Sequence, residues 1–509
     1  MTMLHPGMPT EWALFIGLCI LVLTIWALNA APPGHIRPLA LPLQKLPVIG
    51  PVFRRLLAST WPLLMLKLIL VALFVLVIIA GLWGTPISER NIATTLTWNL
   101  WWAGIVVAIV FTGSAWCAVC PWDTIASWLV NHRLWHRSNS TTRLKLQVPR
   151  LLKSLWPATL LFIGLTWLEL GVGIVSNPYA TALLALLMVT LATVTLALFE
   201  RKAFCRYICP VGRTVGVYSQ LSPIALRSVD PEACKSCKTL DCFHGTELIA
   251  PCPTGQIMGR LQENTYCTSC GNCTQSCSIQ NIGWQLRSPS SEAIQDARPH
   301  IDEAYFMLVL LALTSFHGLT MLPEWEMLMS LLAQQLNDSG QLLISFSIGL
   351  AASLLIPIAL YTLVIRLTLT LFNIEKTTRN LNKLFSGFAF SCLPLAFAYH
   401  LAHNLNHLLR EGSNWSQLFA NPLGIDTLPL SMLEKHQRHM DMLVSPQILF
   451  ALQALLLAGG FWLSVQVIRH RGYRLFAVSG KQLLPLLLFA GAVTALNVWL
   501  VGQPMIMRM

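Results

Sequence analysis

Long apolar runs separated by short basic loops dominate this chain. A helix that crosses a bilayer needs about 20 mainly apolar residues. Ten segments approach that length, near residues 12–30, 62–83, 92–114, 155–176, 179–199, 303–322, 342–365, 384–409, 447–468 and 482–502. Residues 220–300 are instead polar and rich in loop-forming residues. The pattern predicts an all-α polytopic membrane protein with about ten transmembrane helices and one small inserted domain.

The composition favours a membrane protein over a soluble one. Of the 509 residues, 55% are hydrophobic and 11% are charged, whereas soluble proteins carry about 25% charged residues. The formal net charge of +12 comes from loops beside the apolar runs, and no basic groove with interleaved aromatic residues is visible. We therefore expect membrane lipid, and not nucleic acid, around this chain.

The distribution of lysine and arginine predicts an orientation. These residues gather after the first, third, fifth, seventh and ninth predicted helices, whereas residues 323–341 contain none. Basic loops face the cytoplasm, so we expect a bacterial inner-membrane protein with both termini in the periplasm and the polar domain in the cytoplasm. The predicted division is a five-helix domain at 1–219, the polar domain at 220–300 and a second five-helix domain at 301–509.

Eight cysteines of the polar domain follow the spacing of bacterial ferredoxins. They read Cys234-x2-Cys237-x4-Cys242-x9-Cys252-Pro253 and Cys267-x2-Cys270-x2-Cys273-x3-Cys277. In this pattern the fourth cysteine of each run reaches across to the other cluster. One [4Fe-4S] cluster would then be held by Cys234, Cys237, Cys242 and Cys277, and the second by Cys252, Cys267, Cys270 and Cys273. Zinc, the alternative, needs only four ligands per ion and leaves the Cys-Pro step unexplained.

Two further cysteine pairs lie at the ends of predicted helices. They read Cys117-x2-Cys120-Pro121 and Cys205-x3-Cys209-Pro210. Proline suits the first position of a helix, which places Cys120 and Cys209 at helix N-termini, where a thiolate is favoured. The four thiols could hold an additional metal, form a redox dithiol or simply pack against the polar domain.

The cysteine motifs and the apolar helices together resemble the membrane polyferredoxins of the NapH/NosR type. The resemblance covers roughly residues 60–290 and implies an electron carrier that serves periplasmic reductases or their maturation. Cys205–Pro210 fits the Cys-x3-Cys-Pro pattern of that family, whereas Cys117–Pro121 is one residue shorter. Residues 300–509 do not match the family, and the large periplasmic flavin domain of the NosR branch is not visible.

The C-terminal half has its own signal in its histidines. His317 lies in the sixth predicted helix, and His400-x2-His403-x3-His407 lies on one face of the eighth. The following loop adds His436 and His439. Ionisable groups inside a membrane generally mark a functional path, and histidine is the commonest metal ligand. We expect a metal or haem site here, with a polar network that packs the helices as the alternative.

Several chemistries fit these histidines. His403 and His407 are one turn apart and can hold one ion, and b-type haem could take His317 with His400 or His403 as axial ligands. A non-haem iron centre could add carboxylates of the next loop, namely Asp426, Glu434 and Asp441. Copper would be favoured if nearby methionines were ligands, and these are Met321, Met327, Met329, Met432, Met440 and Met442.

The leading prediction is electron transfer across the membrane. A cytoplasmic or quinol donor would reduce the clusters, and electrons would reach the histidine site or a periplasmic acceptor protein. Because the bilayer core is about 30 Å thick, an intermediate carrier is required. The alternatives are a maturation factor that supplies reduced metal to a periplasmic metalloenzyme, and a membrane non-haem iron oxygenase fed by its own ferredoxin domain.

Overall fold

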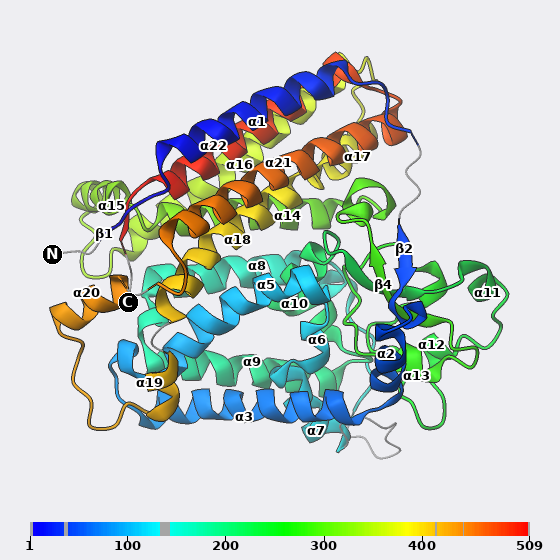
Figure 1. The fold of residues 1–509 in the computed structure, drawn as a ribbon, viewed down its shortest axis with the longest axis horizontal. Helices are drawn as coiled ribbons and strands as arrows, with labels where there is room; N and C mark the ends of the chain where they lie inside the picture. The colour runs from blue at the N-terminus through cyan, green and yellow to red at the C-terminus, as the bar shows by residue number, and fades with distance from the viewer. Residues whose placement is uncertain (1–3, 35–38, 133–142, 413–414, 441, 507–509) are drawn as a thin grey trace.

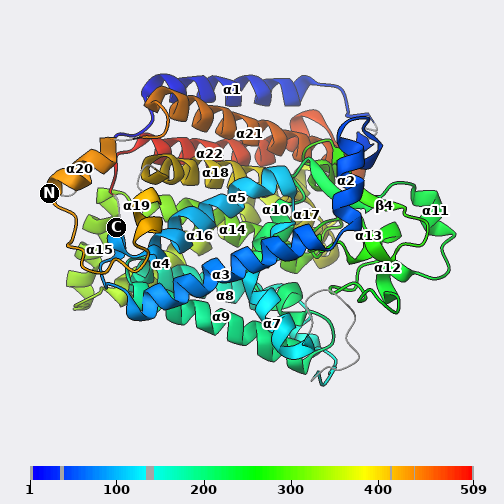
Figure 2. The ribbon, with the colours of Figure 1, turned by 60° about the horizontal axis from the view of Figure 1, so that its bottom comes forward.

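The computed structural model describes residues 4–34, 39–132, 143–412, 415–440 and 442–506. Its long helices run side by side in two groups, and the polar domain covers one end of the assembly (Figures 1 and 2). Within the described residues, nine helices are long and apolar enough to cross a membrane. The prediction of a mostly helical, multi-pass membrane protein is therefore confirmed.

The first group contains helices of the N-terminal half. They are α3 (Trp61–Trp83), α5 (Trp102–Thr112), α8 (Trp156–Thr166) and α9 (Pro178–Leu198). A short α4 (Ile92–Thr94) leads into α5 through the π-helical turn η3 (Thr95–Trp101), and α8 continues into another, η5 (Trp167–Val172). The segment Trp156–Val172 corresponds to the fourth predicted span, 155–176, and it is shorter than the nine long helices. π-Helical turns often accompany functional sites.

The second group is built mainly from the C-terminal half. Its members are α14 (Ile301–Leu319), α16 (Leu343–Leu371), α17 (Thr378–Ala389), α18 (Cys392–Glu411), α21 (Pro446–Phe476) and α22 (Leu484–Gly502). Helix α1 (Thr10–Asn29) joins this group by packing on α21 and α22, although it belongs to the predicted 1–219 domain. Strand β1 (Leu4–His5) pairs with β5 (Met505–Ile506) next to it.

Helix α18 is the central helix of the second group. Within the apolar segment that contains it, Thr378–Arg410, the most apolar stretch of 18 residues is entirely buried in protein. Its packing partners include α14, α21 and α5, so it touches both groups of helices. Polar side chains on α18 therefore face other protein groups and not lipid, which is the setting in which a membrane protein tolerates ionisable residues.

The polar domain is a small sheet with cysteine-bearing loops and short helices. Strands β2 (Ala40–Pro42), β4 (Ile282–Arg287) and β3 (Ile224–Ser228) form the sheet in that order, with antiparallel pairing. The helices are α11 (Pro231–Lys235), α12 (Asp241–His244) and α13 (Asn272–Ser276). Strand β2 comes from outside the predicted 220–300 domain, so the loop after α1 helps to fasten this domain to the helices.

Short helices lie at both ends of the bundle (Figure 1). Near the polar domain these are α2 (Ile49–Ala58), α6 (Trp116–Val119) and α7 (Pro121–Asn131). At the opposite end they are α15 (Pro323–Leu336), α19 (Trp415–Ala420) and α20 (Met432–Met440). Helix α10 (Pro210–Tyr218) differs from both sets because it enters the bundle, and all of its residues are buried.

Basic side chains fasten the polar domain to the helix ends beside it. Arg471 of α21 donates to the carbonyl oxygens of Ala293 and Ala297, at 2.6 and 3.0 Å. Arg474, one turn further on, donates to the Gln295 carbonyl at 2.5 Å. These arginines belong to one of the predicted basic loops, and they lie at the same end of the molecule as the cysteine-rich domain.

Candidate iron–sulfur and histidine sites

The first predicted group of cysteines surrounds one cavity. Its four members, which we call the distal group, are Cys234, Cys237, Cys242 and Cys277, and the cavity has a volume of about 440 Å³. Cys234 lies on α11, Cys242 lies on α12 and Cys277 directly follows α13. The backbone N–H of Leu240 lowers the pKa of the Cys237 thiol. The crossed pattern predicted from the spacing therefore brings the right four thiols together.

The second predicted group lies closer to the helices. Its members, which we call the proximal group, are Cys252, Cys267, Cys270 and Cys273, and their thiols are near enough to interact electrostatically. Cys267 and Cys273 are buried. Burial raises the pKa of Cys267 to about 11, so positive charge from bound iron would be needed to keep it ionised. Both groups offer four thiols, which is the donor set of a [4Fe-4S] cluster.

The two Cys-Pro motifs meet at the membrane edge of the bundle. We call Cys117, Cys120, Cys205 and Cys209 the edge group, and electrostatic interactions link each of them to others in the set. Cys117 also interacts with Cys267 of the proximal group. Pro121 and Pro210 begin α7 and α10, as predicted. The backbone N–H of Gly212 donates to Cys209 Sγ at 3.2 Å, and so the sulfur caps α10.

Burial acts against the helix N-termini at these cysteines. Burial raises the pKa of Cys209 to about 11, although the Gly212 N–H acts in the opposite direction. Burial likewise raises the pKa of Cys117 to about 12. Loss of hydration thus outweighs the helix terminus, because a charge is stabilised far better by water than by one or two N–H groups. A thiolate here requires a bound cation.

Charged groups organise the surroundings of the edge group. Asp123 of α7 forms an ion pair with Lys202, and the Cys205 Sγ lies 3.9 Å from the Asp123 Oδ1. Ser114, which precedes Cys117, is hydrogen-bonded to Ser269 between Cys267 and Cys270, with 2.8 Å between the two hydroxyl oxygens. The first Cys-Pro segment is therefore fastened directly to the loop of the proximal group.

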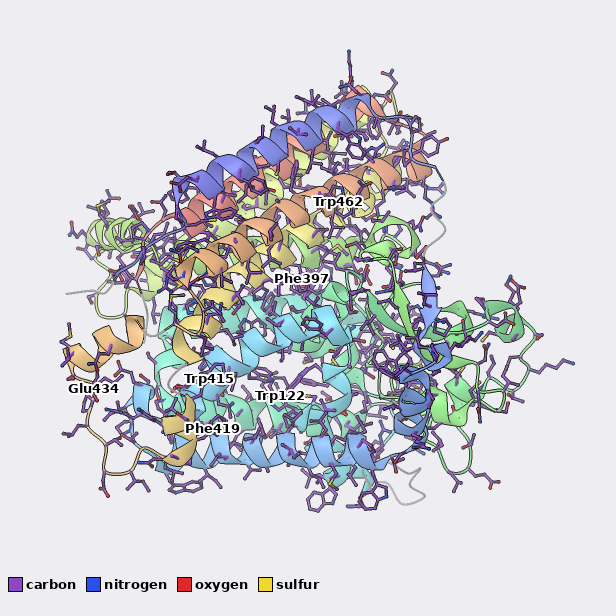
Figure 3. The ribbon with its side chains drawn as sticks, in the orientation of Figure 1. Trp122, Phe397, Trp415, Phe419, Glu434 and Trp462 are labelled. Atoms are coloured by element: carbon purple, nitrogen blue, oxygen red, sulfur yellow. The ribbon has the colours of Figure 1, made fainter. Side chains whose placement is uncertain are left out.

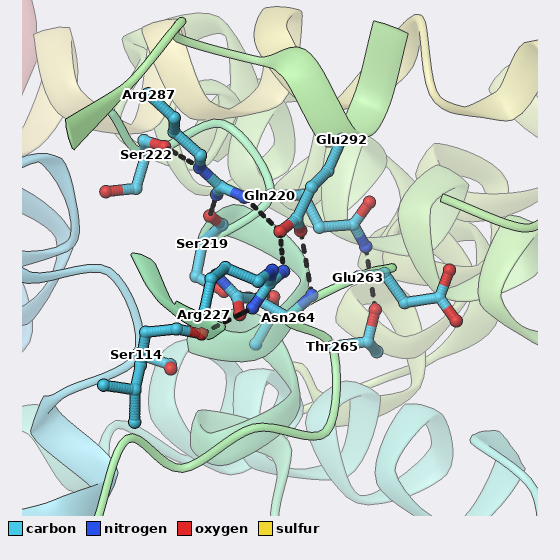
Figure 4. A network of polar contacts seen from close by, with 12 residues as sticks. Ser114, Ser219, Gln220, Ser222, Arg227, Glu263, Asn264, Thr265, Arg287 and Glu292 are labelled. Atoms are coloured by element: carbon cyan, nitrogen blue, oxygen red, sulfur yellow. Dashed lines mark hydrogen bonds and ion pairs between the residues drawn. The ribbon is translucent and has the colours of Figure 1, made fainter. Parts of the chain in front are cut away.

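A buried ionic network fixes the same loop to α10 (Figure 4). Glu292 forms ion pairs with Arg227 and Arg287, and it also accepts a bond of 2.8 Å from the Asn264 backbone N–H. Arg287 donates to the Ser219 carbonyl at 2.7 Å, directly after α10. These bonds determine where the residues just before Cys267 lie relative to the membrane helices.

Aromatic rings connect the edge group with the second group of helices. Trp101 lies 5.9 Å from Trp116 and 5.7 Å from Trp122 between ring centroids, and Trp116 and Pro121–Trp122 flank the first Cys-Pro motif. Trp102 in turn lies 5.7 Å from His400. Figure 3 shows Trp122 and Phe397 inside the bundle. Sequence reasoning missed this arrangement, although five tryptophans within residues 98–122 are a visible signal.

Helix α10 provides a second connection to the same histidine. The Tyr218 hydroxyl lies 3.3 Å from His400 Nδ1, and the Tyr218 ring lies 4.7 Å from that of Phe397. The nine residues of α10 span about 13 Å at 1.5 Å per residue. The gap between the cysteines and the histidine-bearing helix is thus much smaller than the bilayer thickness assumed from the sequence.

A large apolar cavity adjoins the tryptophans. It has a volume of about 310 Å³ and is lined by residues of α3, η3, α5, α8 and α9, including Trp98, Trp101 and Trp102. Pro121 and Pro210 of the two Cys-Pro motifs also line it, and so does the carboxylate residue Glu169 of η5. The cavity therefore lies between the edge group and the second group of helices.

Three of the predicted histidines converge. His317 of α14 and His403 and His407 of α18, which we call the histidine cluster, have ring nitrogens within 4.8 Å of one another. His403 and His407 approach to 3.3 Å between their Nε2 atoms. His400 is not part of this cluster and faces Tyr218 and Trp102. His436 and His439 lie on α20, but their side chains are outside the described part of the structure.

The acidic partner of the cluster is one that the sequence analysis missed. Glu169 Oε1 lies 3.9 Å from His317 Nδ1, and a lone acid within an apolar segment is the signal that could have found it. The expected loop carboxylates lie elsewhere: Glu434 pairs with Arg90 at 3.1 Å and Asp426 is exposed, while Asp441 is outside the described residues. Among the expected methionines, Met327 and Met432 are exposed and Met329 packs against Trp325.

Comparison with known proteins agrees with iron–sulfur chemistry at the membrane edge. The family described as "4Fe-4S binding domain" matches residues 94–138 and 181–223, which contain both Cys-Pro motifs. The "Putative electron transport protein YccM" of Escherichia coli (strain K12) is 33% identical over 109 residues, or 20% of this chain. The chain spans only 28% of the length of that relative. No solved structure matches the chain.

These similarities and the apolar helices together indicate the class of protein to which the chain is similar. The family match covers the edge group, and the eight cysteines of the distal and proximal groups lie outside the matched residues. The likeness to an electron transport protein is partial and covers 20% of the chain. The chain is therefore an iron–sulfur membrane protein that resembles the membrane polyferredoxins and is similar to proteins of electron transport.

Proposed function

We propose that this chain is a transmembrane electron carrier in which the distal, proximal and edge groups each hold one [4Fe-4S] cluster. The observation that carries the proposal is the position of the edge group. The Cys117 thiol interacts with Cys267 on one side, and Trp116 and Trp122 lead from the edge group to Trp101 on the other. Each bound cluster would accept and release a single electron.

The donor sets support clusters in all three places. The distal and proximal groups each bring four thiols together, and the edge group brings four more from two separate motifs. The distal group lies at the exposed end of the polar domain, which suits exchange with a soluble redox partner. The proximal and edge groups are buried or partly buried and lie closer to the membrane helices.

The proposed direction is from the cytoplasm towards the periplasm. Basic residues such as Arg471 and Arg474 gather at the end that carries the polar domain, and this is the end that the positive-inside rule assigns to the cytoplasm. The chain termini lie at the other end (Figure 1). His317, His403 and His407 follow the outward course of α14 and α18 and would lie in the periplasmic half of the bilayer of a bacterial inner membrane.

A lipid-soluble quinone is the proposed exchange partner inside the membrane. The apolar cavity of about 310 Å³ falls in the range of small-molecule sites, which are concave and mostly apolar with a few polar groups. Tryptophan rings line it, and Glu169 supplies the polar group. A carboxylate at this position could exchange the protons that accompany quinone reduction or quinol oxidation.

The iron content of anaerobically purified protein tests the number of clusters. Three clusters of four irons predict about 12 iron and about 12 sulfide per chain. The double variant Cys205→Ser/Cys209→Ser should lose about four of each, because two of the four edge ligands are gone, and it should lose one reduced-state EPR signal. The matched control is Cys19→Ser, since Cys19 lies alone on α1.

Two outcomes would contradict this proposal. Wild-type protein with about eight irons and unchanged iron in the double variant would remove the edge cluster. Zinc with no acid-labile sulfide would remove all three clusters. A quinol pulse that fails to reduce the clusters of intact wild-type protein would remove the quinone from the scheme while leaving the carrier itself in place.

A further inference from the structure

The histidine cluster and Glu169 together join residues from both groups of helices. His317 comes from α14, His403 and His407 come from α18, and Glu169 comes from η5 of the N-terminal half. The three histidines have ring nitrogens within 4.8 Å of one another, and the His317 ring lies 5.0 Å from the His403 ring between centroids. Three imidazoles and one carboxylate thus meet within the protein interior.

The surroundings leave room for an ion but not for a porphyrin. A small cavity of about 30 Å³ is lined by Glu169, His317 and His403 together with His400 and Asn404. A second one of about 20 Å³ lies against the other side of His403. These volumes match one water molecule or one ion, whereas a haem would have to displace the packed side chains around it.

Hydrogen bonds among the histidines alone do not explain the arrangement well. His403 and His407 point their Nε2 atoms at each other at 3.3 Å, and only one of these two atoms can carry the hydrogen of that bond. The third ring nitrogen, from His317, is directed into the same space. Convergence of three nitrogens is the geometry that a tetrahedral metal site with three protein ligands requires.

We infer that His317, His403 and His407 bind one late first-row transition-metal ion. Imidazole suits copper, iron and zinc. Glu169, at 3.9 Å from His317 Nδ1, is placed to orient that ring or to complete the coordination. Because Glu169 also lines the large apolar cavity, it connects the ion with the cavity. The binding of this ion does not depend on the proposed function. Only its role as the last carrier on the electron path rests on that proposal.

Metal analysis of the purified full-length protein tests the inference. Zinc, copper and non-cluster iron are measured in the isolated protein and again after anaerobic addition of Zn²⁺ and removal of the excess. We expect the three metals to sum to about one ion per chain. The zinc X-ray absorption spectrum should show Zn–N distances of about 2.0 Å, and not the Zn–S distance of about 2.3 Å that cysteine ligands would give.

Variants of single histidines provide the comparison. His407→Gln and His403→Gln should each lower the amount of bound ion per chain at least tenfold. His470→Gln is the matched control, because His470 of α21 is also a buried histidine but lines neither of the two small cavities. Iron and sulfide are measured in every variant, so that a loss of the ion with intact clusters separates this inference from folding and from the proposed function.

Three results would overturn the metal site. The first is that wild-type protein with intact clusters retains no zinc, no copper and no non-cluster iron. The second is that the bound zinc shows sulfur neighbours, which would assign it to cysteines. The third is that His403→Gln and His407→Gln hold the ion as tightly as His470→Gln does. Loss of the clusters with retention of the ion would instead contradict the proposed function and leave the metal site standing.

Discussion

At the scale of single residues, Glu292 has the largest structural consequence. Its buried carboxylate neutralises Arg227 and Arg287 and also receives the Asn264 backbone N–H. Removal of one partner from a buried ionic network typically destabilises a protein by about 3–5 kcal/mol, because unpaired charges remain. The sequence showed an ordinary glutamate near the end of the polar domain, and only the packing of β4 against α10 gives it this role.

We therefore expect Glu292→Gln to destabilise the polar domain. Two arginines would lose their counter-charge, and the loop before Cys267 would lose the ionic part of its attachment to the end of α10. The measurement is the thermal unfolding of the anaerobic protein together with iron retention. Glu232→Gln is the control, because its ion pair with Lys235 is exposed and such pairs contribute about 0–1 kcal/mol. Equal unfolding temperatures for the two variants would contradict the role of Glu292.

At the scale of elements, α10 is a buried helix that the apolar runs of the sequence did not predict. It is nine residues long and follows Cys209, whose sulfur caps its first turn. Its last residue, Tyr218, lies against His400. Its buried arginine has a protein partner, since Arg213 donates to the Thr265 carbonyl at 2.6 Å. A short helix that enters the bundle is compatible with membrane depth because it is buried in protein and not exposed to lipid.

The Tyr218 hydroxyl offers a test of this connection. Tyr218→Phe keeps the ring beside Phe397 but leaves a buried nitrogen of His400 without this partner, which destabilises by about 1–3 kcal/mol. We expect a lower unfolding temperature with unchanged iron content. Tyr179→Phe is the matched control, since Tyr179 is exposed at the start of α9. An unfolding temperature equal to that of the control would show that the contact is of no consequence.

At the scale of the whole molecule, the cysteine-rich domain and the chain termini lie at opposite ends (Figure 1). If α14 and α18 cross the bilayer as proposed, the two ends face different compartments. The polar domain presents Lys235 and Lys238 on its surface, and the loop between α15 and α16 presents Ser339 and Gly340. These exposed sites make the sidedness measurable without any change to the cysteines.

Limited proteolysis should then give opposite results in opposite membranes. Trypsin should cleave at Lys235 or Lys238 in inside-out vesicles and spare these sites in spheroplasts. A specific protease site inserted between Ser339 and Gly340 should be cut in spheroplasts only. Cleavage of both sites from one compartment would contradict electron transfer across the bilayer.

Much of this protein was predictable because some features depend on local chemistry alone. Apolar runs located the helices to within a few residues, since the bilayer demands that length of any spanning helix. The spacing of Cys234 to Cys277 predicted which thiols meet, because cluster ligands arranged in short runs can be grouped from the sequence. The convergence of His403 and His407 was likewise visible, since they are one turn apart on one helix.

Other features depend on which distant segments pack together, and they needed the tertiary structure. The placement of α1 beside α22, the entry of α10 into the bundle and the meeting of Glu169 with His317 join residues far apart in the chain. The ionisation of Cys209 also escaped prediction, because helix position is a local property whereas burial is not. Sequence by itself determined the helices and the thiol sets; packing alone decided how closely those sets approach the histidines, since every contact in that approach is made between separate elements.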